Sequence, residues 1–397
     1  MKGIKHTGLA LFVIGLMVFT ASTFLGSFSL NESIIQDNLD KQKYENIGQD
    51  LGVLVGAEYT NPIALGNAIA EVYEVKNEEL KASQQWDKVM YDSPQSVAFS
   101  LVKASAKGTF VESPWLWFFL TFGLAIIGGL AFVLPDMVLL GRPGIKNDKI
   151  YQNPVTNKGW IAWFTFVYLV GFYILLYFFP SSITNQILLL NPISESLSGN
   201  PASQWFLYGF MYCSVMTVMA VRMFVKYRNN KYQVVRTASV LFFQIVFAFI
   251  IPEILVRFNQ PYMDFKSAWP LDYDFFFDWN INSLIANGGL GIFMLVWGIV
   301  LTLIIVPVLS YIYGKRWYCS WVCGCGGLAE TLGDPYRQHS SKTVKSWKVE
   351  RYLIHGVLVF AVVMTGGALY TFFSGETSLF GIQTYTLQRY YGFLIGS

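Results

Sequence analysis

Long apolar stretches dominate the chain and alternate with shorter polar segments. An α-helix needs about 20 mainly apolar residues to cross the hydrocarbon core of a membrane. Seven stretches meet this requirement, at approximately 7–27, 114–139, 160–179, 205–225, 237–256, 285–313 and 352–373. An eighth could begin at Tyr390, and we expect that end either to lie at the membrane interface or to belong to a longer chain. The pattern predicts an all-α fold, a polytopic bundle of transmembrane helices.

The segment between the first two predicted spans has a different character. Residues 28–113 carry 13 acidic residues against seven lysines, for a net charge of −6, and contain no cysteine. Apolar positions recur at helical spacing in stretches such as 63–73. We expect a small helical domain with a docking or capping role. The first span is predicted to be a retained anchor, because its apolar run is longer than the core of a usual signal peptide.

Basic residues gather in alternate loops. The segments 142–159, 222–236 and 314–351 are rich in Lys and Arg, whereas 180–204 has neither and 258–283 sets Lys266 against four aspartates. Short loops rich in Lys and Arg stay cytoplasmic. The N-terminus and the three basic loops are therefore predicted inside, and residues 28–113 outside.

The predicted organisation follows from the spans and the loop charges together. It consists of an anchor at 1–27, an extracytoplasmic domain at 28–113, spans two to six at 114–313, a cytoplasmic cysteine loop at 314–351, and span seven with the start of a possible eighth at 352–397.

Composition removes several classes of protein. The 397 residues are 54% hydrophobic and 17% aromatic but only 13% charged, whereas soluble globular proteins have about 25% charged residues. This excludes an ordinary soluble enzyme and a disordered chain. The net charge of +3 is too small to indicate nucleic-acid binding, which needs a strongly basic face.

Three of the four cysteines lie within seven residues, directly after the sixth predicted span. Cys319, Cys323 and Cys325 have the spacing C-x3-C-x-C, and thiolates favour zinc, copper(I) or iron–sulfur clusters. A disulfide is disfavoured on the cytoplasmic side, and structural zinc usually takes two separated ligand pairs. An iron–sulfur cluster is the favoured interpretation, while another metal or three inert cysteines stay open.

Residues around the thiols suit such a centre. Those that we expect to contribute are Lys315, Arg316, Trp317, Tyr318, Trp321, Gly324, Gly326 and Gly327. The glycines let the backbone approach closely, and their amides could donate to cluster sulfurs. The two cations would offset thiolate charge, and the aromatic side chains would shield the centre and anchor it at the membrane interface.

The stretch from Arg316 to Arg337 resembles the membrane-bound polyferredoxin-type 4Fe-4S proteins, of the NapH and NosR type and the related cytochrome oxidase accessory proteins. In that family an aromatic-flanked C-x3-C motif follows a transmembrane helix, a second such motif follows a later helix, and ferredoxin repeats often come after it. Cys319 and Cys323 match the first motif, Gly324 replaces its usual proline, and Cys325 is an additional thiol. The second motif and the repeats are absent from the sequence.

The resemblance implies an electron-transfer role in the bacterial inner membrane. Single electrons would pass between the quinone pool or a cytoplasmic donor and a respiratory partner, through a cluster, typically 4Fe-4S, held by Cys319, Cys323 and Cys325. Clusters usually take four cysteines, so the fourth ligand stays unidentified. The implied partners are membrane lipid, other subunits of a respiratory complex, and a ferredoxin-like C-terminal part or separate ferredoxin. The protein would act as a subunit of an oxidoreductase complex rather than as a stand-alone enzyme.

The remaining candidate residues are few. Only His355 of the three histidines lies in a predicted span, which nearly excludes a haem with two histidine ligands, and an ordinary polar partner is its expected role. Cys213 lies deep in the fourth span and is expected to be a packing residue. Glu253 and Asp136 are charged residues within predicted spans. A charged residue in a membrane span is by default a candidate functional residue. Glu253 could serve a quinone site, although an ion pair with Arg257 is the simpler expectation.

Two other classes of function compete. In the first, the protein is a non-redox subunit or an assembly factor of a respiratory complex, with a structural, sensory or transiently held metal site. In the second it is a transporter, which ranks last because few charged residues fall at mid-span depth, where transporters place their binding sites.

Overall fold

A computed structural model describes residues 2–139, 159–314, 317–334, 336, 341–376, 378–379 and 381–396. Within these residues, seven helices are long and apolar enough to cross a membrane: Gly3–Phe24, Pro114–Pro135, Trp160–Phe178, Gln204–Lys226, Lys231–Arg257, Gly288–Tyr313 and Val344–Ser374. They confirm the predicted all-α, polytopic class. The chain divides into two compact units, Met1–Arg142 with Tyr151–Val218, and Pro143–Ile150 with Met219–Ser397.

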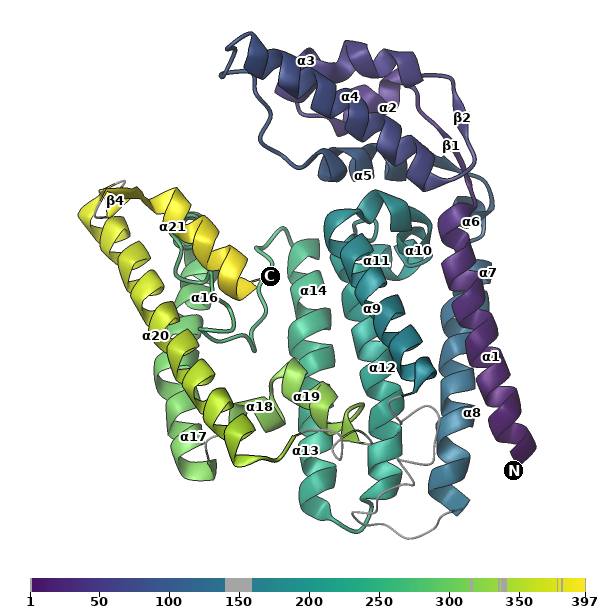
Figure 1. Cartoon of the computed structure of the whole chain (residues 1–397), viewed down its shortest axis with the longest axis vertical. Coiled ribbons are helices and arrows are strands. Elements are labelled where there is room, and N and C mark those ends of the chain that lie inside the picture. Colours follow the sequence, from purple (N-terminus) through teal and green to yellow (C-terminus); the bar gives the residue numbers. More distant parts are fainter. Residues whose placement is uncertain are drawn as a thin grey trace. The chain divides into compact units, whose positions relative to one another are not determined.

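The first unit contains four of these spans and the 28–113 domain (Figure 1). Its α-helices are α1 (Lys2–Ala21), α2 (Glu32–Asn38), α3 (Lys41–Leu51), α4 (Pro62–Ala82), α5 (Pro94–Ala104), α6 (Thr109–Glu112), α7 (Pro114–Phe118), α8 (Leu124–Leu139), α9 (Trp160–Phe178), α10 (Thr184–Leu188), α11 (Asn191–Ser198) and α12 (Gln204–Lys226), the last of which continues into the second unit. Its shorter turns are η1 (Ser22–Phe24), η2 (Gly52–Leu54), η3 (Phe119–Gly123) and η4 (Pro180–Ile183).

The 28–113 domain is mainly helical, as expected, but it also holds a small sheet. The strands β1 (Ser27–Ser29), β2 (Glu58–Tyr59) and β3 (Ala106–Lys107) form an antiparallel sheet in the order β2-β1-β3, with Phe28 opposite both Tyr59 and Ala106. Phe28, Leu65 and Leu101 are fully buried in the core beneath it. Strands of two or three residues are too short to show an alternating pattern in the sequence.

Helix α1 packs tightly along α8 inside the first unit. A Cβ at Gly128 would lie 2.4 Å from the backbone nitrogen of Phe12, and one at Gly8 would lie 2.7 Å from that of Phe132. Small residues let membrane helices approach at this distance. At the other end of α1, the side chain of Gln186 donates to the carbonyl of Phe19 at 2.9 Å. The first span is thus an integral part of its unit.

The second unit holds the other three spans and the cysteine motif. Its α-helices are α13 (Lys231–Phe242), α14 (Ile251–Arg257), α15 (Asp278–Ala286), α16 (Gly288–Val300), α17 (Val306–Tyr313), α18 (Trp317–Trp321), α19 (Gly324–Glu330), α20 (Val344–Ser374) and α21 (Thr384–Tyr391). The π-helical turns η5 (Phe243–Ile250), η6 (Leu301–Ile305) and η8 (Gly392–Gly396) and the strands β4 (Ser378–Leu379) and β5 (Ile382–Gln383) complete it.

The segment between α14 and α15 turns back into the bundle of the second unit. The backbone nitrogen of Trp269 donates to the hydroxyl of Thr302 at 3.1 Å, and the indole of Trp297 donates to the carbonyl of Phe265 at 2.9 Å. Thr302 lies 14 residues into the span Gly288–Tyr313, which is about 20 Å along a helix. The residues 258–277, expected as part of a plain outside loop, are therefore re-entrant.

This re-entrant segment is stable because its polar groups find partners among the helices. Irregular backbone at membrane depth occurs only where it is buried in protein or lines a cavity. The indole of Trp269 donates to Thr365 of α20 at 2.9 Å, and Gln388 of α21 donates to Asp278 at 2.7 Å. Helix α21 begins at Thr384, earlier than the eighth span expected from Tyr390, and Tyr391 is fully buried against Phe277 and α20.

We expect Thr302→Val to loosen the re-entrant segment. The substitution keeps the shape of the side chain but removes the hydroxyl that accepts from Trp269. The backbone N–H of Trp269 is then left without a hydrogen-bond acceptor, which costs about 1–3 kcal/mol of stability. Thermal unfolding in detergent would measure the loss of stability, and the rate of proteolysis within 258–277 would measure the loosening of the segment. Thr165→Val is the control, because that exposed hydroxyl bonds within its own helix. Equal stability of the two variants would contradict the role given to Thr302.

Candidate metal centre

The cysteine motif is built on two short helices that follow a sharp turn. Helix α17 ends at Gly314, whose φ of 108° is accessible mainly to glycine. Cys319 lies in α18, Cys323 caps the start of α19, and Cys325 lies in the first turn of α19. Cys323 is buried, whereas Cys319 and Cys325 are exposed. All four cysteines of the chain are described, and none forms a disulfide.

The motif packs against the first half and the centre of the helix Lys231–Arg257, and its expected position at the cytoplasmic edge of the membrane stays a prediction. The side chain of Gln244 donates to the carbonyl of Val322 at 2.6 Å, and Ser239 donates to the carbonyl of Trp321 at 3.0 Å. Gln244 is the central residue of the span Lys231–Arg257. Figure 1 accordingly shows α18 and α19 between α17 and α13, away from the lower ends of both.

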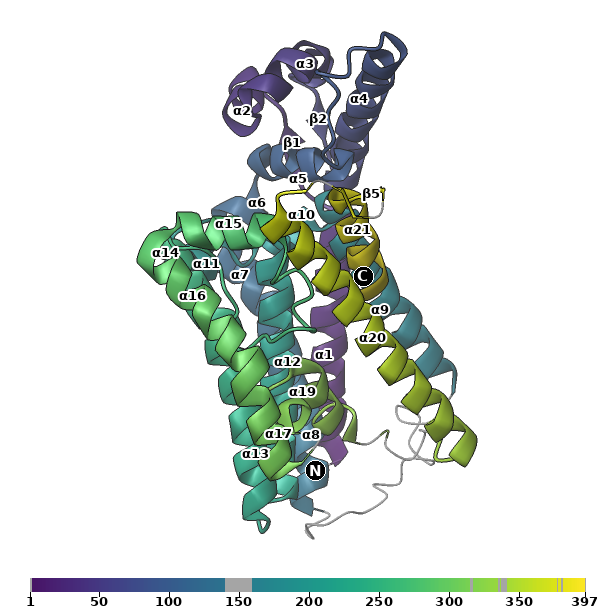
Figure 2. The same cartoon turned by 90° about the vertical axis from the view of Figure 1, so that its left-hand side faces the viewer.

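Here the motif meets the re-entrant segment. The hydroxyl of Tyr318 donates to the carbonyl of Lys266 at 2.5 Å. Ala268 joins Tyr318, Val322 and Cys323 in one apolar cluster, against which Trp317 and Trp321 pack. Figure 2 shows α19, together with α17 and α13, in a view turned by 90°. Burial, and after it the neighbouring Cys323, raises the pKa of Tyr318 above its usual range, so the phenol stays a neutral donor.

Gly326 fixes the distance between the two short helices. A Cβ built on Gly326 would lie 1.5 Å from the carbonyl oxygen of Cys319, so no other residue fits without movement of the backbone. Gly327 is buried in the same turn, and its carbonyl accepts from the hydroxyl of Thr331 at 2.8 Å. The close approach at Gly326 joins two parts of the backbone, and the approach of Gly324, Gly326 and Gly327 to a metal centre stays a prediction. Gly324 begins α19.

The three thiols are only partly brought together. Cys323 and Cys325 share a side-chain hydrogen bond, and burial, followed by the nearby Cys323, raises the pKa of the Cys325 thiol. Lys266 acts on Cys325 in the opposite sense. Within the described residues, no three Cys, His, Asp or Glu side chains converge closely enough to hold a metal ion. Lys315 and Arg316, predicted to balance the charge, lie outside the described residues.

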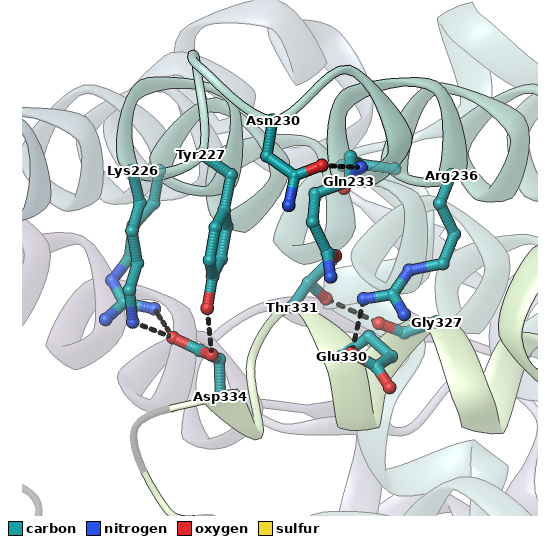
Figure 3. A network of polar contacts seen from close by, with 11 residues as sticks. Lys226, Tyr227, Asn230, Gln233, Arg236, Gly327, Glu330, Thr331 and Asp334 are labelled. Atoms are coloured by element: carbon teal, nitrogen blue, oxygen red, sulfur yellow. Dashed lines mark hydrogen bonds and ion pairs between the residues drawn. The ribbon is translucent and has the colours of Figure 1, made fainter. Parts of the chain in front are cut away.

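A buried ionic network holds the segment that follows α19. Asp334 has an almost fully buried side chain and accepts from Arg222 at 3.1 Å and from Lys226 at 2.7 Å. The hydroxyl of Tyr227 also donates to Asp334, at 3.3 Å. Figure 3 shows the side chains of Lys226 and Tyr227 pointing at Asp334.

A second ion pair lies one turn earlier along the same segment. Arg236 of α13 donates to Glu330 of α19 at 2.6 Å (Figure 3). Buried ionic groups are costly unless paired and hydrogen-bonded, so these contacts tie α19 to the ends of α12 and α13. This role was not predicted from the sequence, because the basic residues of 222–236 were interpreted only as a sign of which side of the membrane the loop lies on.

Comparison with known proteins bears directly on this region. Residues 291–343 match the model of a family described as a 4Fe-4S binding domain. The matched residues run from α16 through the cysteine motif, which supports an iron–sulfur protein. The search of curated proteins and the search of solved structures each found no match.

The donors of this domain suit an iron–sulfur cluster in kind. Cysteine thiolates are its usual ligands, and Cys323 and Cys325 already share a side-chain hydrogen bond. Three thiols are one fewer than the usual set of four.

The other candidates lie elsewhere. His355 is exposed on α20, where its Nδ1 lies 2.7 Å from the carbonyl of Arg351, an ordinary polar partner as expected. Cys213 belongs to the first unit. Glu253 lies in the first turn of α14, and Asp136 lies in α8.

We expect Gly326→Ala to disrupt the centre. The added methyl group would meet the carbonyl oxygen of Cys319, and overpacking against backbone costs about 1–3 kcal/mol or more. The amount of iron bound per chain and the thermal unfolding temperature should both fall. Gly356→Ala is the matched control, because a Cβ there has open space in α20. Full iron content in Gly326→Ala would refute this account of the turn.

Asp334→Asn should destabilise the same region by another route. It removes the negative charge that faces two buried cations, and breaking a buried ion pair costs about 3–5 kcal/mol. Exposed Asp50 pairs with Lys76 on the surface, so Asp50→Asn should cost at most about 1 kcal/mol. Thermal unfolding in detergent compares the two variants, and similar losses would contradict the anchoring role.

Proposed function

We propose that this protein is an integral membrane electron-transfer protein that passes single electrons between the quinone pool or a cytoplasmic donor and a respiratory partner. The observation that carries the proposal is the match of residues 291–343 to a 4Fe-4S binding domain. Its cysteine motif is held level with the middle of a candidate membrane span. A bound iron–sulfur cluster supplies reversible one-electron transfer.

Each residue of the motif has a task in this proposal. Cys319, Cys323 and Cys325 would hold the cluster, and a fourth ligand would come from another part of the protein, a partner chain or substrate. Ser239 and Gln244 fix the carbonyls just before Cys323. The thiols could then reorient when a cluster binds, while the surrounding helices stay in place.

The aromatic residues would keep water from the centre. Tyr318 is buried, Trp317 and Trp321 are half-buried, and all three pack in the cluster that contains Cys323. Solvent exposure and hydrogen bonds to the sulfurs are among the factors that set cluster potential. A site shielded on the side of Cys323 suits electron exchange with a partner that is dissolved in the membrane.

The proposed setting is a bacterial inner membrane, with the N-terminus in the cytoplasm and residues 28–113 outside. The loop charges support this orientation. The expected partners are lipid, further subunits of a respiratory complex, and a ferredoxin or ferredoxin-like part. Quinone is an expected redox partner, and Glu253 is its proposed contact.

A second candidate is an assembly or maturation factor that holds a cluster only transiently. The exposure of Cys319 and Cys325 favours it, because an open site can release what it binds. In this case no quinol or low-potential donor would reduce the bound cluster.

Anaerobic purification of the full chain tests the proposal. We expect iron and acid-labile sulfide in equal amounts and an EPR signal on reduction. Single changes of Cys319, Cys323 or Cys325 to Ser should each lower the iron content several-fold, whereas Cys213→Ser should leave it unchanged. Zinc without sulfide would end the electron-transfer proposal. A cluster that neither quinol nor a low-potential donor reduces would favour the maturation factor.

A further inference from the structure

Helix α20 is longer than a membrane crossing requires. Its 31 residues, Val344–Ser374, extend over about 46 Å at the rise of an α-helix, whereas the hydrocarbon core of a bilayer is about 30 Å thick. The apolar run of this helix covers 352–373, and the preceding residues 344–351 contain three cations and one carboxylate. The first two turns of α20 therefore extend past the hydrocarbon core to the level of the lipid headgroups.

The N-terminal half of α20 is exposed in the structure. Residues 344–359 are all exposed, apart from Ser346, which is half-buried. Leu353 and Ile354, at the start of the apolar run, are 61% and 56% exposed. The C-terminal half, in contrast, is part of the apolar cluster that contains Tyr391. The N-terminal half is thus left uncovered by the parts of the chain that the structure describes.

An open groove follows this exposed face of α20. It is lined by Lys345, Ser346, Val349, Glu350, Leu353 and Ile354. Neighbours three and four residues apart share one side of a helix, and these positions have that spacing. The lining residues with polar side chains lie in the first two turns, whereas Leu353 and Ile354 lie in the apolar run. The groove is therefore polar at one end and apolar at the other, in the same order as the headgroup and the acyl chains of a phospholipid.

The charge around the groove indicates which kind of lipid it fits. Segment 341–355 sets one carboxylate, Glu350, against four cations: Lys342, Lys345, Lys348 and Arg351. The guanidinium of Arg351 lies 5.7 Å from the ring centre of Trp347, and tryptophan is enriched at the membrane interface. Basic residues beside a membrane span attract anionic lipids. A symmetric dimer through this face would bring the same cations of two copies together, which disfavours a second copy as the occupant.

We propose that the groove of α20 binds an anionic phospholipid. Its phosphate lies beside Lys345 and Lys348, and an acyl chain lies along Leu353 and Ile354. Charge selects the headgroup, and the apolar end of the groove selects a lipid over a soluble phosphate. This binding is separate from the proposed electron transfer and does not depend on a bound cluster.

Native mass spectrometry of the full chain in detergent micelles, titrated with phosphatidylglycerol or with phosphatidylcholine, tests the proposal. We expect tighter binding of phosphatidylglycerol. Lys345→Gln and Lys348→Gln should each weaken that binding about fivefold, because one cation near the headgroups is lost, and should leave phosphatidylcholine binding unchanged. Lys345→Arg should match the wild type. Lys81→Gln is the control, because Lys81 is an exposed lysine of the 28–113 domain.

Equal affinity for the two lipids overturns the inference, as does a loss in Lys345→Gln and Lys348→Gln no larger than that in Lys81→Gln. Glycerol phosphate, which carries the same phosphate without acyl chains, should not displace the lipid. Displacement by it at equal concentration would show a site for soluble phosphate instead. The same spectra report the number of chains, and a dimer that excludes phosphatidylglycerol would identify a second copy as the occupant and also overturn the inference.

Discussion

The structure of the second unit depends on hydrogen-bond partners for irregular backbone in the middle of a helical bundle. Two segments enter from opposite ends, and their carbonyl and N–H groups need partners where water is scarce. Gln244 donates to Val322, Thr302 accepts from Trp269, and Tyr318 donates to Lys266. Without these contacts the cysteine motif would have to lie at the end of the bundle, where unpaired backbone groups could bind water.

This constraint explains why the site combines apolar packing with strongly polar anchors. The aromatic cluster around Cys323 excludes water, while Asp334 and Glu330 hold the end of α19 through buried ion pairs. The π-helical turn η5 begins at Phe243, just before Gln244. Such turns often accompany functional sites, and here the turn lies where the side chain of Gln244 meets the motif.

Sequence analysis recovered the architecture well because membrane spans have a strong signal. All seven predicted spans are present as helices, with ends within a few residues for most of them, since each needs a long apolar run. The short strands β1 to β3 gave no comparable signal. The re-entrant residues 258–277 were also missed, because their acidic composition resembles that of an exposed loop, and their partners lie far away in the chain.

The sequence by itself determined the class of protein, the number of long apolar helices and the thiol donors at 319, 323 and 325. These depend on local composition and spacing. Tertiary structure decided the contact of the motif with Gln244, the close backbone approach at Gly326 and the hydrogen bond of Tyr318 to the segment 258–277. The physical reason is that the hydrogen bonds and ion pairs that place the motif join residues up to 112 positions apart, such as Arg222 and Asp334, and no local pattern records such pairings.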